Sequence, residues 1–239
     1  EIGQLVGNYN IMVDRINDLM TEQTRTAEKL KVSEVKALQA QINPHFLYNM
    51  LDMINWLAQS GQQEKVSAAI QTLSKFYKLT LSKKNITIPI GEELRHVSLY
   101  VMLQNMRFEN KIEFIVDVPD EIMEYEIPKL VLQPIVENSI LHGIFERESK
   151  AGNIVIMAWT ENGDIIFTVS DTGMGIRPER LKTILDGTEE SEHGSNIGIY
   201  NTHMRLKYLY GEKYGLHFES NYGQGTEVQV RIPAVWKPS

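Results

Sequence analysis

The sequence predicts two kinds of structure in one chain. The N-terminal part reads as an α-helical coiled coil and a helical hairpin that would complete a dimeric four-helix bundle. An α+β domain, with a mixed sheet against helices, is expected to follow. Apolar residues recur every three or four positions in the first part, for example at Leu38, Ile42 and Phe46, which is the helical period. In the second part they alternate in short runs between helical stretches, as strands interleaved with helices do.

Composition narrows the class of protein. The chain has 239 residues, of which 42% are hydrophobic and 23% are charged, a balance typical of globular domains. The net charge of −7 argues against direct nucleic-acid binding, which usually requires a basic surface. The absence of cysteine excludes disulfides and thiolate zinc sites. No apolar run approaches the length of a membrane span.

Residues 1–33 are expected to form a coiled coil. A single amphipathic helix that packs on its own domain is the alternative, but the segment has no proline, which favours a parallel dimer seam. Two sets of residues separated by multiples of seven occupy the seam positions of a heptad repeat: Ile2, Tyr9, Ile16 and Leu30 in one set, and Leu5, Met12 and Leu19 in the other.

Two further amphipathic helices are expected at about 34–59 and 64–82, separated by a turn at 60–63. A short turn between such helices makes an antiparallel hairpin. One hairpin is too thin to bury both apolar stripes, so two hairpins from two chains would form a four-helix bundle, and we predict a homodimer. The predicted domains are a signalling coiled coil at 1–33, a dimerisation hairpin at 34–87 and the α+β domain at 88–239.

Pro44 and His45 stand inside the first hairpin helix. A proline inside a helix removes one backbone hydrogen bond and usually bends the axis, and a histidine offers a neutral ring nitrogen as a nucleophile. Asn49 follows one helical turn later on the same face, where its amide can orient the ring. A lone histidine on an amphipathic helix is more often a solvated residue than a catalytic one, so His45 alone does not decide the function.

The helices and strands of the α+β domain are predicted from the same two patterns, apolar residues every three or four positions for a helix and alternating apolar residues for a strand. The sequence Asn162-Gly163 between two apolar runs is a good hairpin turn. Because the expected strands come in hairpin pairs, a mixed sheet against helices is favoured over a doubly wound parallel sheet. The expected helices lie at 91–107, 128–143, 178–186 and 197–210, and the expected strands lie at 112–118, 154–158, 165–169, 216–220 and 226–232.

Three polar clusters in this domain could bind a ligand. Glu137 and Asn138 lie in an otherwise apolar helix, where the amide oxygen suits magnesium. On the evidence of this cluster alone, the polar face of a surface helix is the better interpretation. Asp171, Gly173 and Gly175 follow an expected strand. Glycines there let the backbone approach a ligand closely, and the carboxylate could accept a hydrogen bond from an exocyclic amine. An ordinary turn after a strand is the competing interpretation.

A third cluster runs from Gly194 to Gly198 and leads into a helix. Backbone N–H groups at a helix N-terminus bind phosphate, although an ordinary glycine loop is again the alternative. The pattern is not a Walker motif, because no lysine follows, and the glycines at 173 and 175 lack the third glycine of the Rossmann motif. A further glycine turn precedes Thr226.

The order and spacing of these clusters resemble a known superfamily. An asparagine on a helix, then Asp-x-Gly-x-Gly, a glycine-rich lid and Gly-x-Thr are similar to the N, G1, G2 and further glycine boxes of the GHKL ATPases, whose Bergerat fold is an α/β sandwich that holds Mg-ATP. The sequence Gln-Ile-Asn-Pro-His-Phe-Leu-Tyr-Asn at 41–49 resembles the phosphoacceptor box of the LytS/YesM-type sensor histidine kinases. The motifs around Arg107 and Arg205 are also similar to that family, and residues 1–13 resemble the end of a HAMP linker.

The resemblance implies a role for each matching residue. His45 would be phosphorylated beside Asn49, with Glu137 as a candidate general base. Asn138 would ligate Mg²⁺ and Asp171 would bind the adenine amine. The other residues implied to bind ATP are His142, Gly173 and Gly175 in the nucleotide pocket, Gly194 and Gly198 at the borders of the lid, and Thr226 beside the base.

For the protein as a whole, the resemblance implies an ATP-dependent histidine kinase of a two-component system. It would autophosphorylate His45 as a homodimer and pass the phosphoryl group to an aspartate of a response regulator receiver domain. The chain starts at Glu1 rather than Met, so we expect the cytoplasmic portion of a bacterial cell-membrane receptor that is anchored upstream of residue 1.

Several departures from the family pattern keep rival functions open. Asn196 stands where a third lid glycine is common, and Leu141 replaces a frequent basic residue. Both support a nucleotide-gated dimeric scaffold or pseudokinase, which binds ATP without transferring phosphate. A GHKL ATPase or serine kinase is another alternative, but Pro134 stands where hydrolytic relatives carry a water-activating glutamate, which favours transfer to His45.

Overall fold

The computed structural model of the protein describes residues 15, 20, 44–81, 86–185 and 195–236, with only the backbone described at 195–197. Contacts between Cα atoms divide the chain into two units, 1–49 and 50–239. The predicted coiled coil lies outside the described residues apart from Arg15 and Met20, which are helical. The residues before Pro44, and with them the predicted bend, also lie outside the described part. Within the described ranges, no helix is both long and apolar enough to cross a membrane.

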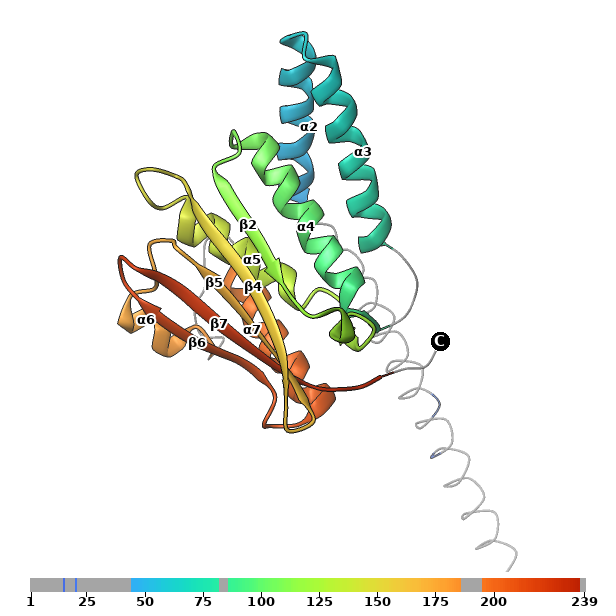
Figure 1. Ribbon diagram of the computed structural model, residues 1–239, viewed down its shortest axis with the longest axis vertical. Helices are drawn as coiled ribbons and strands as arrows, with labels where there is room; N and C mark the ends of the chain where they lie inside the picture. Colours follow the sequence, from blue (N-terminus) through green and yellow to red (C-terminus); the bar gives the residue numbers. More distant parts are fainter. Residues whose placement is uncertain (1–14, 16–19, 21–43, 82–85, 186–194, 237–239) are drawn as a thin grey trace, which may run out of the picture. The chain divides into compact units, whose positions relative to one another are not determined.

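The predicted helical hairpin is confirmed. Helix α2 spans Pro44–Gln59 and α3 spans Gln63–Thr80, and the chain reverses between them so that α3 runs back along α2 (Figure 1). Both helices bury an apolar stripe of three-to-four spacing, as an amphipathic helix requires. The buried stripe consists of Met50, Met53 and Leu57 on α2 and of Ala69, Leu73 and Phe76 on α3.

The predicted mixed sheet is also confirmed. Its five strands lie in the order β2-β4-β5-β7-β6, with β2 parallel to β4 and all other neighbours antiparallel. The turn between β4 and β5 has positive φ at both Asn162 and Gly163, as a two-residue hairpin requires. The strands span Ile112–Asp117 (β2), Gly152–Glu161 (β4), Asp164–Asp171 (β5), Gly215–Asn221 (β6) and Gly225–Pro233 (β7).

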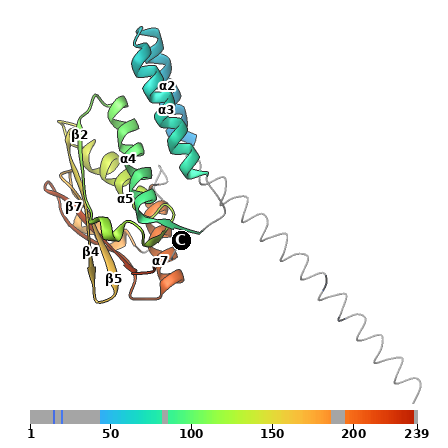
Figure 2. The same ribbon diagram turned by 45° about the vertical axis from the view of Figure 1, so that its right-hand side comes forward.

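One face of the sheet is covered by helices α4 (Ile90–Arg107), α5 (Leu132–Asn138) and α7 (Ser195–Tyr210), which lie on the same side of the sheet in Figure 2. The short helix α6 spans Pro178–Thr183, and a 3₁₀ turn spans Asp120–Ile122. Alternate residues of the central strands point into the core between the two layers. They are Ile154 and Ile156 of β4, Phe167 and Val169 of β5, and Val228 and Val230 of β7.

The predicted helix at 128–143 is wrong at its start. Glu126–Pro128 forms strand β3, which pairs with β1 at Thr87–Pro89. The backbone at Leu130 then has a φ of 57°, which no right-handed helix accommodates, so α5 begins only at Leu132. After Asn138 the helix continues as a π-helix over Ser139–Ile144. Such wider turns frequently occur at functional sites.

Helix α3 contacts α4 through a buried histidine. The ring of His96 is stacked on Phe76 with a centroid distance of 4.5 Å, and its Nε2 lies 2.8 Å from the hydroxyl oxygen of Thr80. That hydroxyl donates to the carbonyl of Phe76, so its oxygen accepts the proton on Nε2. The other ring nitrogen, Nδ1, is buried and has no hydrogen-bond partner among the described residues. The environment therefore suits a neutral ring.

This environment predicts a pH-dependent stability. Burial, assisted by the charge of Lys129, lowers the pKa of His96 from 6.5 to about 4. The unfolded chain therefore binds a proton between these two values that the folded chain does not bind, so stability falls as the pH is lowered through this window. We expect His96 to account for a loss of about 2–3 kcal/mol between pH 7.5 and 4.5.

The variant His96→Gln keeps a donor for Thr80 but cannot titrate. Denaturant unfolding at both pH values and a fixed protein concentration would measure the effect. The loss of stability on acidification should be smaller in His96→Gln by about 2–3 kcal/mol. An equal loss in both proteins would show that this ring does not control the pH dependence.

Candidate functional site

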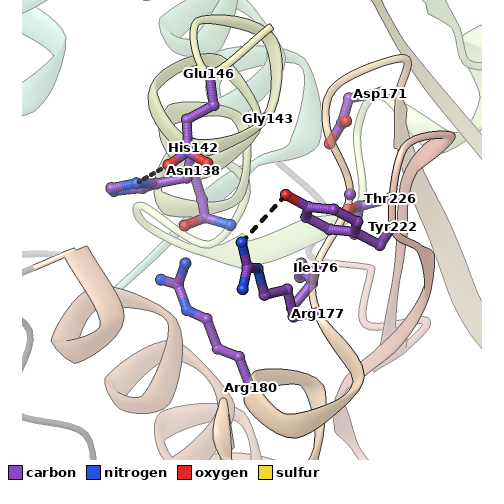
Figure 3. Close-up of a pocket in the computed structure, with 11 residues that line it drawn as sticks. Asn138, His142, Gly143, Glu146, Asp171, Ile176, Arg177, Arg180, Tyr222 and Thr226 are labelled. Atoms are coloured by element: carbon purple, nitrogen blue, oxygen red, sulfur yellow. Dashed lines mark hydrogen bonds and ion pairs between the residues drawn. The ribbon is translucent and has the colours of Figure 1, made fainter.

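A pocket lies at the end of the sheet where β5 ends and β7 begins. Asp171, the last residue of β5, is paired with Thr226 at the start of β7, and the π-helical turn lies next to both. The pocket brings together five of the residues predicted to form the site: Asn138, His142, Asp171, Gly175 and Thr226 (Figure 3). Six further residues complete its lining: Gly143, Glu146, Ile176, Arg177, Arg180 and Tyr222.

Asp171 is the buried carboxylate of this pocket, with 7% of its surface exposed. The backbone N–H of Gly173 donates to its Oδ1 at 2.8 Å. Burial raises the pKa of the Asp171 carboxyl, while hydrogen bonds from the Ser139 side chain and from the backbone of Gly173 and Thr226 act in the opposite direction. These donors hold the carboxylate in a fixed orientation at the pocket, where it can accept a hydrogen bond from a ligand amine.

The glycines after Asp171 let the chain pass very close to other backbone. A Cβ atom on Gly173 would lie 2.4 Å from the backbone C and Cα of Gly143. Gly175 has a φ of +72°, and a Cβ there would lie 2.3 Å from the carbonyl oxygen of Asn221. Gly173 does not line the pocket itself, but its contact with Gly143 fixes the distance between Asp171 and the π-helical turn.

Asn138 ends α5 and faces the pocket (Figure 3). Its Oδ1 is buried and has no hydrogen-bond partner among the described residues, and such an orphaned polar atom is costly unless a ligand satisfies it. An amide oxygen is a hard ligand of the kind that Mg²⁺ uses, together with waters and phosphates. The described residues contain no group of three or more His, Cys, Asp or Glu side chains that could hold a metal alone. The donor set therefore fits Mg²⁺ bound jointly with phosphates.

In Figure 3 His142 lies to the left of Asn138, away from the strands, and Glu146 lies above it. His142 Nδ1 is 3.4 Å from a carboxylate oxygen of Glu146, one helical turn later. Both side chains line the pocket. The His142 ring therefore forms part of the pocket wall, where it can stack on a ligand or form a hydrogen bond with it. The Glu146 carboxylate orients this ring.

The N-terminus of α5 is held by a buried acid that the sequence did not reveal. Glu93 of α4 has no exposed surface, and its carboxylate accepts the backbone N–H groups of Leu130, Val131 and Leu132 at 3.0, 2.9 and 3.0 Å. Arg205 of α7 donates to the carbonyl of Leu130 at 2.9 Å. Burial raises the pKa of Glu93, and the three N–H groups and the charge of Arg205 oppose this rise. The network fixes the helix that carries Asn138.

Among the described residues predicted for the ATP site or its chemistry, Gly198 and Glu137 also lie outside the pocket lining. Gly194 falls outside the described residues. Gly198 lies in α7, where a Cβ would be 3.6 Å from the Cβ of Pro134, so it is placed at the contact of α7 with α5. Glu137 is half-buried and its charge adds to burial in raising the pKa of Tyr100. Its role as a general base remains a prediction.

His45 and Asn49 lie on α2. As predicted, their side chains lie next to each other on one face of this helix. The amide nitrogen of Asn49 is 3.3 Å from Nδ1 and 3.4 Å from Nε2 of His45. The His45 side chain is exposed, so a phosphoryl donor can reach its ring. An amide N–H beside a neutral ring nitrogen can orient that ring.

Six lining residues were not predicted from the sequence, and two of them could have been. Ile176 and Arg177 directly follow the glycine motif, so their approach to the ligand was implied by the motif itself. Arg180 and Tyr222 gave no signal, because a surface helix and a hairpin turn are ordinary places for arginine and tyrosine. Gly143 and Glu146 depend on the π-helical turn, which changes the face of the helix that they occupy.

Comparisons with known proteins identify both parts of the chain. Residues 33–112 match the family described as "Histidine kinase". Residues 125–235 match the family described as "Histidine kinase-, DNA gyrase B-, and HSP90-like ATPase". Among solved structures, the histidine kinase domain of a blue-light activated histidine kinase from Erythrobacter litoralis has a TM-score of 0.47 and 20% identity, and the match covers 83% of this chain and 92% of that one.

Among curated proteins, "Sensor histidine kinase YesM" of Bacillus subtilis is 38% identical over 233 residues, which are 98% of this chain and 39% of that protein. "Sensor protein LytS" of Bacillus cereus is 35% identical over 85% of this chain and 34% of that protein. The chain thus spans about two fifths or less of the length of these relatives. The predicted domain boundaries remain predictions. With its two matched domains and its pocket of Asn138, Asp171 and Thr226, the chain belongs to the sensor histidine kinases of the LytS/YesM type.

Proposed function

We propose that this chain is the ATP-binding and phosphoacceptor part of a sensor histidine kinase, and that it transfers the γ-phosphoryl group of Mg-ATP to a ring nitrogen of His45. The observation that supports this most is the pocket in which the buried Asp171 carboxylate and the orphaned Oδ1 of Asn138 face the same space. A carboxylate for an adenine amine and an oxygen ligand for a hard cation are the two contacts that Mg-ATP needs.

The proposed step is an in-line displacement at phosphorus. A ring nitrogen of His45 forms a bond to the γ-phosphorus while the bond between this phosphorus and the β–γ bridging oxygen breaks, and ADP leaves. Asn49 orients the ring, and Glu137 is the candidate base that takes the proton from the other ring nitrogen once the attacking nitrogen has used its lone pair. Asn138 would hold Mg²⁺, which when bound offsets the charge on the phosphate oxygens. Pro134 offers no side chain that activates water, which favours transfer over hydrolysis.

The wider biology of the protein belongs to the same proposal. Large apolar side chains that stay exposed on the hairpin, Leu51 and Trp56 on α2 and Ile70 on α3, support dimerisation through a four-helix bundle. The phosphoryl group on His45 would pass to an aspartate of a response regulator receiver domain. The names of the relatives, which are sensor proteins, support a receptor whose sensor lies outside this chain. A membrane anchor upstream of residue 1, joined by a linker whose HAMP-like end is residues 1–13, is part of the same proposal.

The nucleotide assignment is tested through Asp171. We expect calorimetric titration in Mg²⁺ to show that the wild type prefers ATP to ITP, in which the 6-amino group is replaced by oxygen. Asp171→Asn should weaken ATP binding by about tenfold or more, because a hydrogen bond to a charged group is lost, and should reduce the preference for ATP. Asp117→Asn, at an exposed position of β2, is the matched control. Equal binding of both nucleotides by the wild type would refute the role of Asp171.

A further inference from the structure

The charge of the pocket described above is unusual for a site that holds a polyanion. Two carboxylates line it, those of Asp171 and Glu146. The helix that carries Asn138 and its π-helical continuation contain no lysine or arginine, as the sequence from Leu132 to Ile144 shows. Mg²⁺ held by Asn138 would offset part of the charge of a bound triphosphate, but this helix supplies no permanent cation for the remaining negative charge.

Two arginines line the opposite wall of the pocket. Among the described residues that line the pocket, Arg177 and Arg180 are the only lysine or arginine side chains. Both extend from the start of α6 into the pocket and toward Asn138 (Figure 3). Pro178 restricts Arg177 to an extended backbone, which it adopts with a ψ of 143°. Arg180 follows three residues later, at a spacing that can bring both side chains to one side of the segment.

Tyr222 holds Arg177 in this position. The guanidinium carbon of Arg177 lies 5.2 Å from the centroid of the Tyr222 ring, a cation–π distance, and one guanidinium nitrogen lies 3.5 Å from the tyrosine hydroxyl. Stacking leaves the in-plane N–H groups of a guanidinium directed sideways, where they can bind phosphate oxygens in a fork. Tyr222 comes from the turn between β6 and β7, so the rigid sheet positions the arginine.

We propose that Arg177 and Arg180 bind the triphosphate of the nucleotide, and that Tyr222 positions Arg177 for this contact. The assignment rests on the proposed function, since it concerns the same nucleotide. The proposed function of Arg177 and Arg180 differs from that of Asp171. Asp171 binds the base and is indifferent to the number of phosphates, whereas the arginines respond to that number.

The test compares ligands that differ only in phosphate count. ATP, ADP, AMP and adenosine are titrated in Mg²⁺ into the wild type, Arg177→Gln, Arg180→Gln and Lys182→Gln. Lys182 lies in the same helix but is exposed and does not line the pocket, so it is a control for the loss of one positive charge. We expect each arginine variant to bind ATP about tenfold more weakly, as for the loss of a charged hydrogen bond. The effect should shrink stepwise to less than about twofold for adenosine.

The outcomes separate the two claims. A loss of equal size for adenosine and ATP would overturn the assignment, because the arginines would then contact the base or support the pocket. Unchanged ATP binding in both variants, or an equal loss in Lys182→Gln, would overturn it as well, while leaving the ATP site intact. A wild type that binds none of the four ligands would overturn the proposed function together with the arginine assignment.

Discussion

Replacement of Gly173 by alanine is expected to abolish ATP binding, with an affinity at least about 100-fold below that of the wild type. The added Cβ would lie 2.4 Å from the backbone of Gly143 and 2.7 Å from Oδ1 of Asp171. Real Cβ atoms do not approach other atoms so closely, and backbone cannot yield as a flexible side chain does. The clash would separate Asp171 from the π-helical turn, and both line the pocket.

Gly91→Ala is the matched control for this substitution. Gly91 lies in α4, and a Cβ there would be 3.6 Å from the nearest atom, the carbonyl oxygen of Met123, which is an ordinary contact. Alanine is also the better helix former, so the stability of this variant should be unchanged or slightly raised. Calorimetric titration with ATP would compare both variants with the wild type. Wild-type affinity in Gly173→Ala would show that the observed approach of Gly173 to Gly143 is not needed for the site.

Local patterns in the sequence predicted the elements that depend on local interactions. The hairpin of β4 and β5 follows from Asn162-Gly163, because the positive φ that such a turn needs is a property of those two residues. The hairpin of α2 and α3 follows in the same way from apolar periods of helical spacing around a short turn. Asn49 could be placed beside His45 because helix geometry alone brings residues four apart together.

The parts that were missed depend on contacts between distant segments. Glu93 reads as one more acid in the first turn of a helix, yet its partners lie 37 to 39 residues away. Strand β3 has only three residues, and its strand conformation comes from pairing with β1 rather than from its own apolar pattern. For the same reason the predicted helix at 128–143 started too early.

In the candidate site, too, the residues defined by a local motif were predicted, and those placed by distant contacts were not. The motif around Asp171, Gly173 and Gly175 was recognisable because close backbone approach demands glycine. Arg180 was not recognisable, since nothing in the local sequence tells which face of a short surface helix points to a ligand. Thr226 was predicted as a site residue from the order of the motifs along the chain. Its position opposite Asp171 depends on the register of β5 and β7, which the sequence did not predict.

Phosphoryl transfer to His45 is measured most directly by incubation of the protein with γ-labelled ATP and Mg²⁺. We expect the wild type to become labelled, with a label that is stable in base and lost in acid, as a phosphorus–nitrogen bond requires. His45→Gln should remain unlabelled because it lacks the nucleophile, and Asn138→Ala should remain unlabelled because it lacks the predicted ligand of Mg²⁺. His217→Gln, which removes an exposed histidine on β6, should be labelled as the wild type is. Acid-stable label, or full labelling of His45→Gln, would contradict the account.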